Sequence, residues 1–490
     1  MFLDRLRDKS LFRQQIFIDG VWSAASSKAE LPVDNPATGE IIGSIPACGT
    51  ADTRAAIEAA KTAFVHWRMR TAAERAAVLE RWYGLVLDNA DDLAVIMTAE
   101  QGKPLAEAKG EVLYGASFIK WFAEEARRIA GSTIPAPTAD RRILVLKEPV
   151  GVSAVITPWN FPNAMITRKC APALAAGCTV VIKPSELTPY SALALIVLAE
   201  RAGVPKGVIN IVTGLPQEIG AELTGNMAVR KLSFTGSTRI GSLLMQECAP
   251  TVKRLSLELG GNAPFIVFDD ADIDLAIEGA LASKFRNGGQ TCVCANRILV
   301  QEGIYDRFAD RLAAFVSKMR IGSGFEADTQ IGPLINLAAV EKVHAHIDDA
   351  RSKGALDLTE RKDDIDPKHF VSPVVLTNAT MAMRVATEET FGPVAPLFRF
   401  RHEAEAIEIA NDTPFGLAAY FYTENLHRSW RVGERLEFGM VGLNTGSVSM
   451  EIAPFGGIKQ SGLGREGGPT GIEEYLEVKS FHIGGLRSEA

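Results

Sequence analysis

The chain has 490 residues, of which 47% are hydrophobic and 23% charged, and this length predicts two or three domains. Its 52 Lys and Arg residues are outnumbered by 59 Asp and Glu residues, which gives a formal net charge of −7. This composition excludes extended disorder, and it provides no basic surface for nucleic acid or for an anionic membrane.

The sequence gives no sign of a secretory signal, a membrane span or a metal site. Charges at Asp4 and Arg5 precede any apolar run, and the longest aliphatic stretch, Ala192–Ala199, is too short to cross a bilayer. The six cysteines are scattered and form no Cys-x-x-Cys, and the seven histidines form no His-Glu-x-x-His. We therefore expect a cytoplasmic protein without a metal.

The first 150 residues predict helices followed by an exposed arm. Apolar residues recur at helical spacing over 51–67 and over 71–99, which predicts one amphipathic helix in each range. The prolines near residue 135 and the alternation from Arg142 to Lys147 predict an extended arm instead of domain core. The tail Val478–Ile483 alternates in the same way, and we expect it to pair with this arm, in the same subunit or in a neighbour.

From Gly151 onward, short β-branched runs alternate with helical segments, which predicts a parallel sheet with helices on both faces. The predicted strands are Val152–Ile156, Thr179–Lys183, Val208–Val212 and Lys231–Phe234, and the predicted helices include Ser191–Arg201 and Thr238–Cys248. A second α/β region is expected from near Ala263 to about residue 470, with a charged, mobile loop at Glu360–Lys368.

Gly236 and Ser237 lie between a predicted strand and a predicted helix. Glycine lets the backbone approach a pyrophosphate, and the N-terminus of a helix favours its negative charge. The motif is not the full Gly-x-Gly-x-x-Gly pattern, so an ordinary strand-to-helix turn explains it equally well on its own.

Three residues have the chemistry of a catalytic site. Cys292 follows Gly288 and Gly289, which favours a presented nucleophile over a buried structural cysteine. Glu258 lies between leucines at the end of a predicted strand, where desolvation suits a general base, although a strand-end glutamate that reaches solvent is the alternative. Asn160 lies between two prolines, which suits either a rigid oxyanion donor or an Asx turn.

Taken together, these segments resemble the aldehyde dehydrogenase superfamily over nearly the whole chain. The segments that carry the resemblance are Pro158–Pro162, Lys183–Glu186, Phe234–Ser237, Glu258–Gly261, Gly289–Cys292, Glu389–Pro393, Asn444 and Pro454–Gly457. Within the superfamily the chain is most similar to the succinate-semialdehyde dehydrogenases, through Ile166–Lys169, Lys284–Asn287 and Thr291–Arg297.

The resemblance implies an α/β fold in three parts. It predicts a Rossmann-like cofactor domain over 1–127 and 148–258, an α/β catalytic domain over 259–471, and a small β oligomerisation arm over 128–147 and 472–490. A homodimer or homotetramer is then expected.

The resemblance also implies a reaction and the residues that carry it. Cys292 is expected to attack the aldehyde, Asn160 to hold the oxyanion, and Glu258 to activate the water that hydrolyses the thioester. The positions that bind NAD, or less well NADP, are Thr157, Pro158, Trp159, Lys183, Ser185, Glu186, Gly236, Ser237, Glu389 and Phe391. Glu186 falls where relatives that prefer NAD carry a glutamate.

The expected substrate is succinate semialdehyde, held through its distal carboxylate by Arg168 and Arg286 with Ser449 as a third contact. Glutarate semialdehyde or another ω-carboxyl aldehyde is the alternative, since one methylene changes binding by only about 1–3 kcal/mol. A coenzyme A-acylating dehydrogenase is a further alternative, which the presence of Glu258 disfavours. A catalytically idle relative is another, which the presence of Cys292, Glu258 and Asn160 together disfavours. Cys294, two residues after the nucleophile, suggests either a redox switch or a small filler residue.

Overall fold

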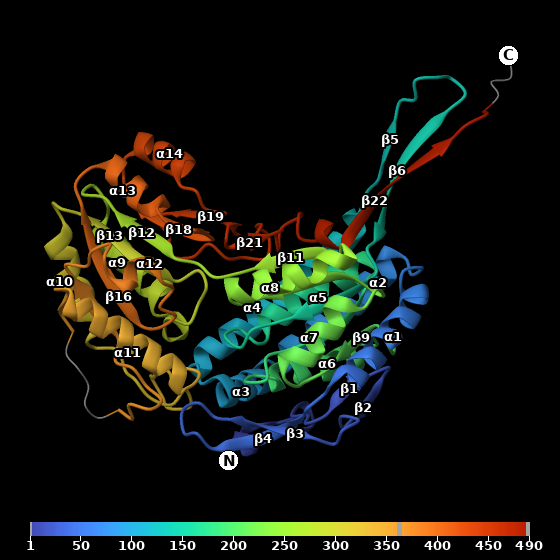
Figure 1. Ribbon diagram of the computed structural model, residues 1–490, viewed down its shortest axis with the longest axis horizontal. Coiled ribbons are helices and arrows are strands. Elements are labelled where there is room, and N and C mark those ends of the chain that lie inside the picture. The colour runs from blue at the N-terminus through green and yellow to red at the C-terminus, as the bar shows by residue number, and fades with distance from the viewer. Residues whose placement is uncertain (1, 360–364, 487–490) are drawn as a thin grey trace.

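The computed structural model describes residues 2–359 and 365–486. Figure 1 shows two α/β bodies side by side, with a narrow arm that extends away from them at the C-terminal end of the chain. The first part of the loop predicted at Glu360–Lys368, residues 360–364, and the last four residues of the predicted arm lie outside these ranges. Within them, no helix has both the length and the apolar character to cross a membrane.

The first body is built on an eight-stranded sheet whose central strands are parallel and buried. In spatial order its strands are β2 (Val21–Ser23), β1 (Ile16–Ile18), β9 (Ile209–Ile211), β8 (Thr179–Lys183), β7 (Val152–Ile156), β10 (Val229–Thr235), β11 (Arg254–Glu258) and β21 (Gly462–Leu463). Strands β1, β2 and β21 run antiparallel to their neighbours, so the sheet is mixed at its edges. A two-stranded ribbon of β3 (Glu30–Asp34) and β4 (Ile41–Pro46) lies beside it.

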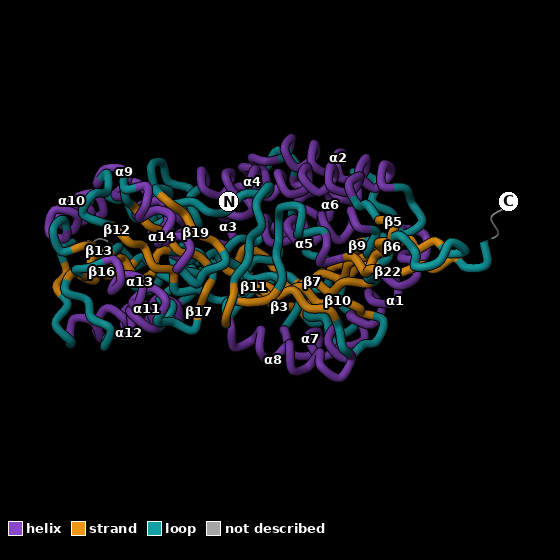
Figure 2. The backbone as a smooth tube through the Cα atoms, turned by 90° about the horizontal axis from the view of Figure 1, so that it is seen from above, coloured by secondary structure: helices purple, strands orange, loops and turns teal. Residues whose placement is uncertain are grey.

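Helices cover both faces of this sheet, as Figure 2 shows. One face carries α2 (Ala72–Asp88), α3 (Ala90–Gln101), α4 (Leu105–Glu125), α5 (Ala164–Ala176) and α6 (Tyr190–Arg201) over one hydrophobic cluster. The other face carries α1 (Thr50–Trp67), α7 (Pro216–Gly225) and α8 (Thr238–Cys248) over a second cluster. Because both faces are covered, the central strands β7 and β8 are buried along nearly their whole length and show no alternation of buried and exposed residues.

The second body is a seven-stranded sheet, also with a hydrophobic cluster on each face. Its strands in spatial order are β14 (Leu356–Asp357), β15 (Val374–Thr377), β16 (Val394–Phe400), β13 (Ala295–Gln301), β12 (Ala263–Val267), β18 (Ala418–Tyr422) and β19 (Met440–Leu443). On one face lie α9 (Ile273–Lys284) and α10 (Tyr305–Val316), and on the other lie α11 (Leu337–Ser352), α12 (Arg384–Thr387), α13 (Glu403–Asn411) and α14 (Leu426–Arg435). A short ribbon of β17 (Phe415–Gly416) and β20 (Ile458–Lys459) completes it.

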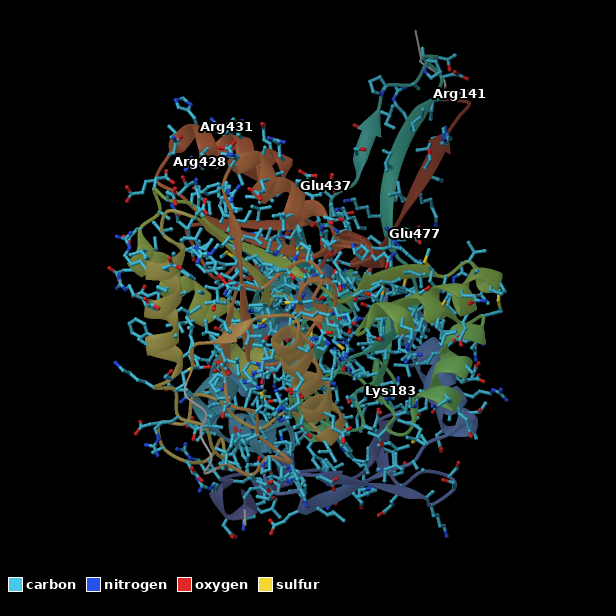
Figure 3. The ribbon with its side chains drawn as sticks, turned by 60° about the vertical axis from the view of Figure 1, so that its left-hand side comes forward. Arg141, Lys183, Arg428, Arg431, Glu437 and Glu477 are labelled. Atoms are coloured by element: carbon cyan, nitrogen blue, oxygen red, sulfur yellow. The ribbon has the colours of Figure 1, made fainter. Side chains whose placement is uncertain are left out.

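The arm is a three-stranded antiparallel sheet in the order β22 (Leu476–Ile483), β6 (Arg142–Pro149) and β5 (Ser132–Ile134). Strand β22 pairs with β6 along its full length, from Leu476 opposite Pro149 to Ile483 opposite Arg142. The predicted pairing of tail and arm is therefore found within one subunit. Figure 3 shows Glu477 where the arm leaves the body and Arg141 near its far end.

The α/β prediction is confirmed, and the predicted strands and helices of the first sheet all occur within two residues of their expected ends. The single helix predicted over 71–99 is wrong, because the chain turns at Asn89 between α2 and α3. The side-chain amide of Asn89 donates to the carbonyl of Leu85 at 2.8 Å and so takes up a carbonyl at the end of α2. Apolar spacing continues on both sides of this turn, which is why periodicity alone does not mark it.

Candidate active site

The first sheet has a topological switch point between β7 and β10. From β7 the chain continues to β8 and β9 on one side, whereas β10 and β11 lie on the other side. Open α/β sheets bind ligands outside the carboxyl ends of the strands at such a point. Thr157 and Pro158 directly follow β7, and Gly236 and Ser237 directly follow β10.

Ser237 is the N-cap of α8, and its hydroxyl accepts a hydrogen bond from the backbone N–H of Ile240 at 3.4 Å. The exposed end of this helix presents backbone N–H groups and the positive end of the helix dipole. The strand-to-helix turn predicted around Gly236 is thus suited to an anionic group.

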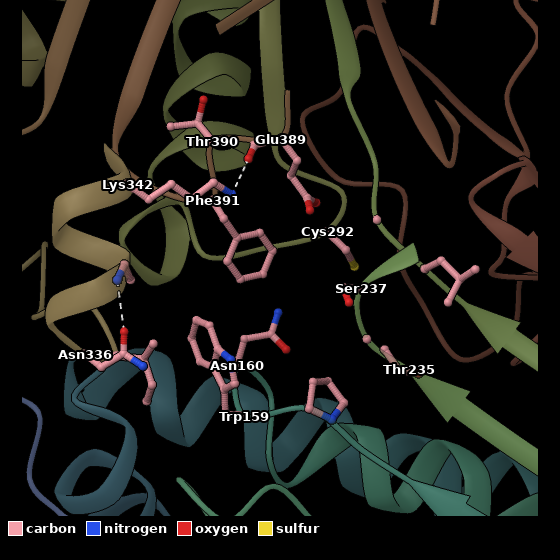
Figure 4. Close-up of a pocket in the computed structure, with 16 residues that line it drawn as sticks. Trp159, Asn160, Thr235, Ser237, Cys292, Asn336, Lys342, Glu389, Thr390 and Phe391 are labelled. Atoms are coloured by element: carbon pink, nitrogen blue, oxygen red, sulfur yellow. Dashed lines mark hydrogen bonds between the residues drawn. The ribbon is translucent and has the colours of Figure 1, made fainter. Parts of the chain in front are cut away.

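A cavity of about 330 Å³ opens at this point, between the two sheets. Its lining includes most of the predicted catalytic and cofactor residues: Pro158, Trp159, Asn160, Gly236, Ser237, Cys292, Glu389 and Phe391. Figure 4 shows the sulfur of Cys292 pointing into this space, with Asn160 across from it. The rings of Trp159 and Phe391 meet edge to face, with centroids 5.5 Å apart.

The loop before Cys292 has a constrained backbone. Asn287, Gly288 and Gly289 have φ values of 54°, 61° and 76°, all in the left-handed region. A Cβ atom at Gly289 would collide with the carbonyl of Gly392, so only glycine fits there. This turn brings the half-buried Cys292 to the cavity wall, as expected for a presented nucleophile.

Burial raises the pKa of the Cys292 thiol to about 12. The positive charges of Arg168 and Arg286 lower this pKa, while the carboxylates of Glu389 and Glu258 raise it. Since the thiolate is the nucleophile, the thiol has to lose its proton to a nearby base before it can react.

Glu258 ends β11, is 3% exposed, and has a carboxylate oxygen without a hydrogen-bond partner among the described residues. Burial, and next the negative charge of Glu466, raise its pKa well above the ordinary value, whereas Arg168 and Lys169 act in the opposite direction. A raised carboxyl pKa at neutral pH suits a general base.

Asn160 is buried beside the Cys292 loop. Its side-chain nitrogen donates to the carbonyl of Gln290 at 3.0 Å, which fixes the amide plane. A side-chain amide has two N–H donors, so Gln290 leaves one of them for a ligand.

Glu389 and Lys342 form the opposite side of the cavity (Figure 4). The backbone N–H of Gly261 donates to the Glu389 carboxylate at 3.2 Å, and burial raises the pKa of this carboxyl to about 7. Lys342 donates to the backbone carbonyl of Glu389 at 2.6 Å. Lys342 was not predicted, because a lysine on an exposed helix face gives no sequence signal of its own.

Lys183 ends β8, the strand next to β7, and Ser185 and Glu186 follow it. None of the three is among the lining residues of the cavity. The ammonium of Lys183 lies 2.6 Å from the Glu186 carboxylate. The hydroxyl of Ser185 accepts from the backbone N–H of Leu187 at 3.2 Å. These side chains lie at the carboxyl edge of the sheet, outside the lining of the cavity.

A second cavity, of about 540 Å³, has Arg286, Tyr420, Val293 and Ser449 among its lining residues. Arg286 is exposed there, and the Ser449 hydroxyl shares a hydrogen bond with the hydroxyl of Tyr114. Two of the three predicted carboxylate contacts therefore meet in one cavity, close to the Cys292 loop.

Arg168, the third predicted contact, is buried in α5 and paired with Glu466 at 2.7 Å. Its guanidinium also lies 4.0 Å from the ring centroid of Phe455. The Nε–H of Arg168 has no hydrogen-bond partner among the described residues. A substrate carboxylate at this arginine would therefore share it with Glu466, which sequence reasoning missed because its Gly-rich surroundings predict only a loop.

Comparison with known proteins agrees with this geometry. The model of the aldehyde dehydrogenase family matches residues 22–481. The chain belongs to the aldehyde dehydrogenase family. It is 62% identical to a glutarate-semialdehyde dehydrogenase of Pseudomonas putida, over 98% of this chain and 99% of that protein. It is 60% identical to a succinate-semialdehyde dehydrogenase [NADP(+)] of Escherichia coli, over 98% of this chain and all of that protein.

A crystal structure of an aldehyde dehydrogenase from Brucella melitensis superimposes with a TM-score of 0.97 at 60% identity, covering 98% of this chain and 99% of that one. The aldehyde dehydrogenase fold implied by the sequence motifs is therefore confirmed, and members of this family use NAD or NADP.

In this aldehyde dehydrogenase, Cys294 is buried and its thiol donates to the carbonyl of Lys284 at 3.1 Å. Cys292 and Cys294 are both free thiols. Burial raises the pKa of Cys294, which disfavours its thiolate. The geometry is compatible with both predicted roles, the redox switch and the filler residue.

Proposed function

We propose that this aldehyde dehydrogenase oxidises an aldehyde with a distal carboxylate, and that succinate semialdehyde is converted to succinate. Glutarate semialdehyde is the alternative within the same class. The observation that carries the proposal is the exposed guanidinium of Arg286 beside Ser449 in a cavity next to the Cys292 loop. The names of the two relatives reported above, both semialdehyde dehydrogenases, support it.

The proposed carboxylate site follows from the charge of the substrate. An anionic tail taken out of water needs charge-assisted partners, and a guanidinium binds a carboxylate in a planar fork. Arg286 provides such a fork at the cavity, and the buried Nε–H of Arg168 is a donor in need of an acceptor. Ser449 is proposed to add a neutral hydrogen bond.

NAD or NADP fits the 330 Å³ cavity by the chemistry of its donors and acceptors. The N-terminus of α8 at Ser237 suits the pyrophosphate, and the Glu389 carboxylate suits the hydroxyls of the nicotinamide ribose. The hydroxyl of Thr235, which also lines the cavity, is buried and without a partner among the described residues. The bound cofactor supplies the hydride acceptor for the oxidation.

In the first half of the proposed reaction, Cys292 releases its proton to solvent water, and its sulfur attacks the aldehyde carbon. The resulting thiohemiacetal carries an oxyanion, which the free N–H of the Asn160 amide and the backbone N–H of Cys292 stabilise. Removing one such donor typically costs about 10²–10³ in rate. A bound cofactor would accept the hydride that this thiohemiacetal loses, and Cys292 would then hold the acyl group as a thioester.

In the second half, Glu258 takes a proton from a water molecule that attacks the thioester carbon. Its raised pKa keeps it basic enough for this step near neutral pH. The carbon–sulfur bond then breaks, the carboxylic acid leaves, and Glu258 passes the proton that it took from water to the sulfur of Cys292.

NAD is proposed as the preferred cofactor, with NADP as a weaker substitute. The carboxylate of Glu186 would face a 2′-phosphate, and like charges in a cleft cost several kcal/mol unless a cation intervenes. Lys183, which pairs with Glu186 at 2.6 Å, is the available cation. The E. coli relative, named with NADP(+), argues for the other choice, so the residue and the relative point in different directions.

The test is a kcat/KM panel over ω-carboxyl aldehydes of increasing length, with uncharged aldehydes of matched length as controls. We expect a maximum at four or five carbons and a large advantage for the charged member of each matched pair. Equal kcat/KM for charged and uncharged members would contradict the proposal.

A further inference from the structure

Lys103 is a buried lysine that the proposed reaction does not use. It lies between α3 and α4, directly after Gly102, and only 2% of it is exposed. Its ammonium group lies 2.5 Å from the carboxylate of Glu111 on α4, which is also buried. Burying two charges is costly unless their geometry and hydrogen bonds are good.

The second partner of the Lys103 ammonium is the backbone carbonyl of Asn160, to which it donates at 2.8 Å. Its nitrogen also lies 4.1 Å from the ring centroid of Phe161, the next residue. The ammonium therefore holds the turn that carries Asn160 through the backbone carbonyl and the neighbouring ring.

Glu111 connects the same pair to the start of α5. One of its oxygens accepts from Lys103, and the other accepts from the backbone N–H groups of Asn163 at 2.9 Å and Ala164 at 3.1 Å. The Asn160 turn is thus fixed relative to α5, the helix that carries Arg168.

The Cys292 loop is tied to the same carbonyl. The side-chain nitrogen of Asn287 donates to the Asn160 carbonyl at 3.0 Å, and the side chain of Gln101 donates to Asn287 at 3.0 Å. Gln101 in turn accepts from the backbone N–H of Lys103 at 3.0 Å. One buried network therefore spans the lysine, the Asn160 turn and the loop of the nucleophile.

We propose that Lys103 is a positioning residue, whose ammonium, neutralised by Glu111, holds the Asn160 backbone so that the side-chain amide meets the aldehyde oxygen. Stability alone is a poor reason for the pair, because replacing a buried ion pair with apolar residues is often neutral or stabilising. The Lys103 side chain is also only 1% exposed, so the space around it fits a compact ammonium group. A planar guanidinium has a different shape and does not match this space. This inference rests on the proposed oxyanion role of Asn160.

The test is a double-mutant cycle that uses the full-length enzyme and the pre-steady-state burst of reduced cofactor. The charge-neutral variant Lys103→Met/Glu111→Gln is measured in the Asn160 background and in the Asn160→Ala background. Misplacement of the Asn160 amide can change the burst rate only in an enzyme that still has this amide. In the Asn160 background we therefore expect the double variant to lower the burst rate roughly 10- to 100-fold, which is the effect of a small misplacement of a catalytic group. In the Asn160→Ala background we expect it to lower the burst rate by less than about twofold.

Lys231→Met is the matched control. Lys231 is a buried lysine in β10 that donates to the hydroxyl of Ser256 at 2.6 Å, away from the cavity. We expect its effect on the burst to be the same in both backgrounds, whatever it does to the melting temperature. Equal losses from the Lys103 variant in the two backgrounds would overturn the inference, because they would indicate a general structural role.

The Asn160→Ala variant by itself separates the two proposals. If it loses less than about tenfold in burst rate, the oxyanion role fails, because such donors contribute about 10²–10³. If it loses more, but the Lys103 effect is equal in both backgrounds, only the positioning role fails. Where the charge-neutral variant does not fold, Lys103→Arg takes its place in the same cycle, and an unchanged burst rate in the Asn160 background would overturn the inference.

Discussion

The guanidinium of Arg168 lies 2.7 Å from the carboxylate of Glu466, so an arginine of the proposed substrate site is paired with a carboxylate of the C-terminal segment. Glu466 also pairs with Lys169, and both cations lower its pKa. Its negative charge raises the pKa of Glu258. Arg168, which is proposed to bind the substrate carboxylate, and the charges that shift the pKa of Glu258 therefore belong to one buried cluster.

Glu466→Gln is expected to move the acid limb of the kcat profile to lower pH. In the proposed reaction Glu258 acts as a base above its own pKa, and the activity is lost as the pH falls through that value. Removing the nearby negative charge lowers the pKa of Glu258, and the displacement is expected to be roughly one pH unit. The measurement is kcat for thioester hydrolysis as a function of pH.

Lys169→Met removes a positive charge instead of a negative one, so it should move the acid limb to higher pH. If the acid limb stays in place in both variants, the charges of Glu466 and Lys169 do not influence the pKa of Glu258.

Arg286→Ala is expected to reduce kcat/KM for succinate semialdehyde by roughly 10- to 100-fold, because a hydrogen bond to a charged group contributes about 1.5–3 kcal/mol. Butanal lacks the carboxylate, so its kcat/KM should change little. Equal losses for the two aldehydes would show that Arg286 does not bind the substrate carboxylate.

Glu186→Ser is expected to improve the use of NADP relative to NAD. The substitution removes the carboxylate that would oppose a 2′-phosphate and leaves Lys183, now without its partner at 2.6 Å, free to pair with it. The ratio of kcat/KM values for the two cofactors measures the effect. A wild-type enzyme that uses NADP as well as NAD would show that Glu186 does not set the choice.

Cys294→Ala tests reversible oxidation. If a strained disulfide forms between Cys292 and Cys294, mild peroxide should inactivate the wild-type enzyme, and dithiothreitol should restore its activity. The variant has no partner for Cys292, so its inactivation should be restored less completely. Full recovery of Cys294→Ala would favour the filler role.

The arm is expected to mediate association of subunits. β22 and β5 are its outer strands, and each leaves one edge without a strand partner in the described chain. Exposed strand edges are normally covered, most simply about a two-fold axis. Light scattering should therefore give a dimer or a tetramer, and an active monomer near the chain mass of 52.8 kDa would contradict this.

The sequence predicts the structure best where the type of a residue and the local backbone that its neighbours favour indicate the same role. Cys292 after two glycines is predicted as a nucleophile from local pattern, and the buried strand β8 is predicted from its β-branched run. For Glu258 the local pattern leaves a solvent-facing glutamate as the alternative, and the predicted role comes from the family resemblance. Lys103, Glu466 and Lys342 are not predicted from the sequence, because the contacts that connect them to the candidate site are made with residues distant in sequence. A charged residue in a helix or loop is usually solvated, and only the fold shows that Lys103 and Glu466 are buried and paired.

The C-terminal segment also determines when the first body can finish folding. Strand β21 adds to its sheet, and the side chains of Ile472 and Tyr475 pack in its hydrophobic cluster. On the ribosome these residues are made only after the whole of the second sheet. Domains generally fold as they emerge, N-terminal part first. Until the C-terminal segment is synthesised, the first body has an unpaired sheet edge and an incomplete core. We therefore expect chaperones to bind mainly to the first body during synthesis.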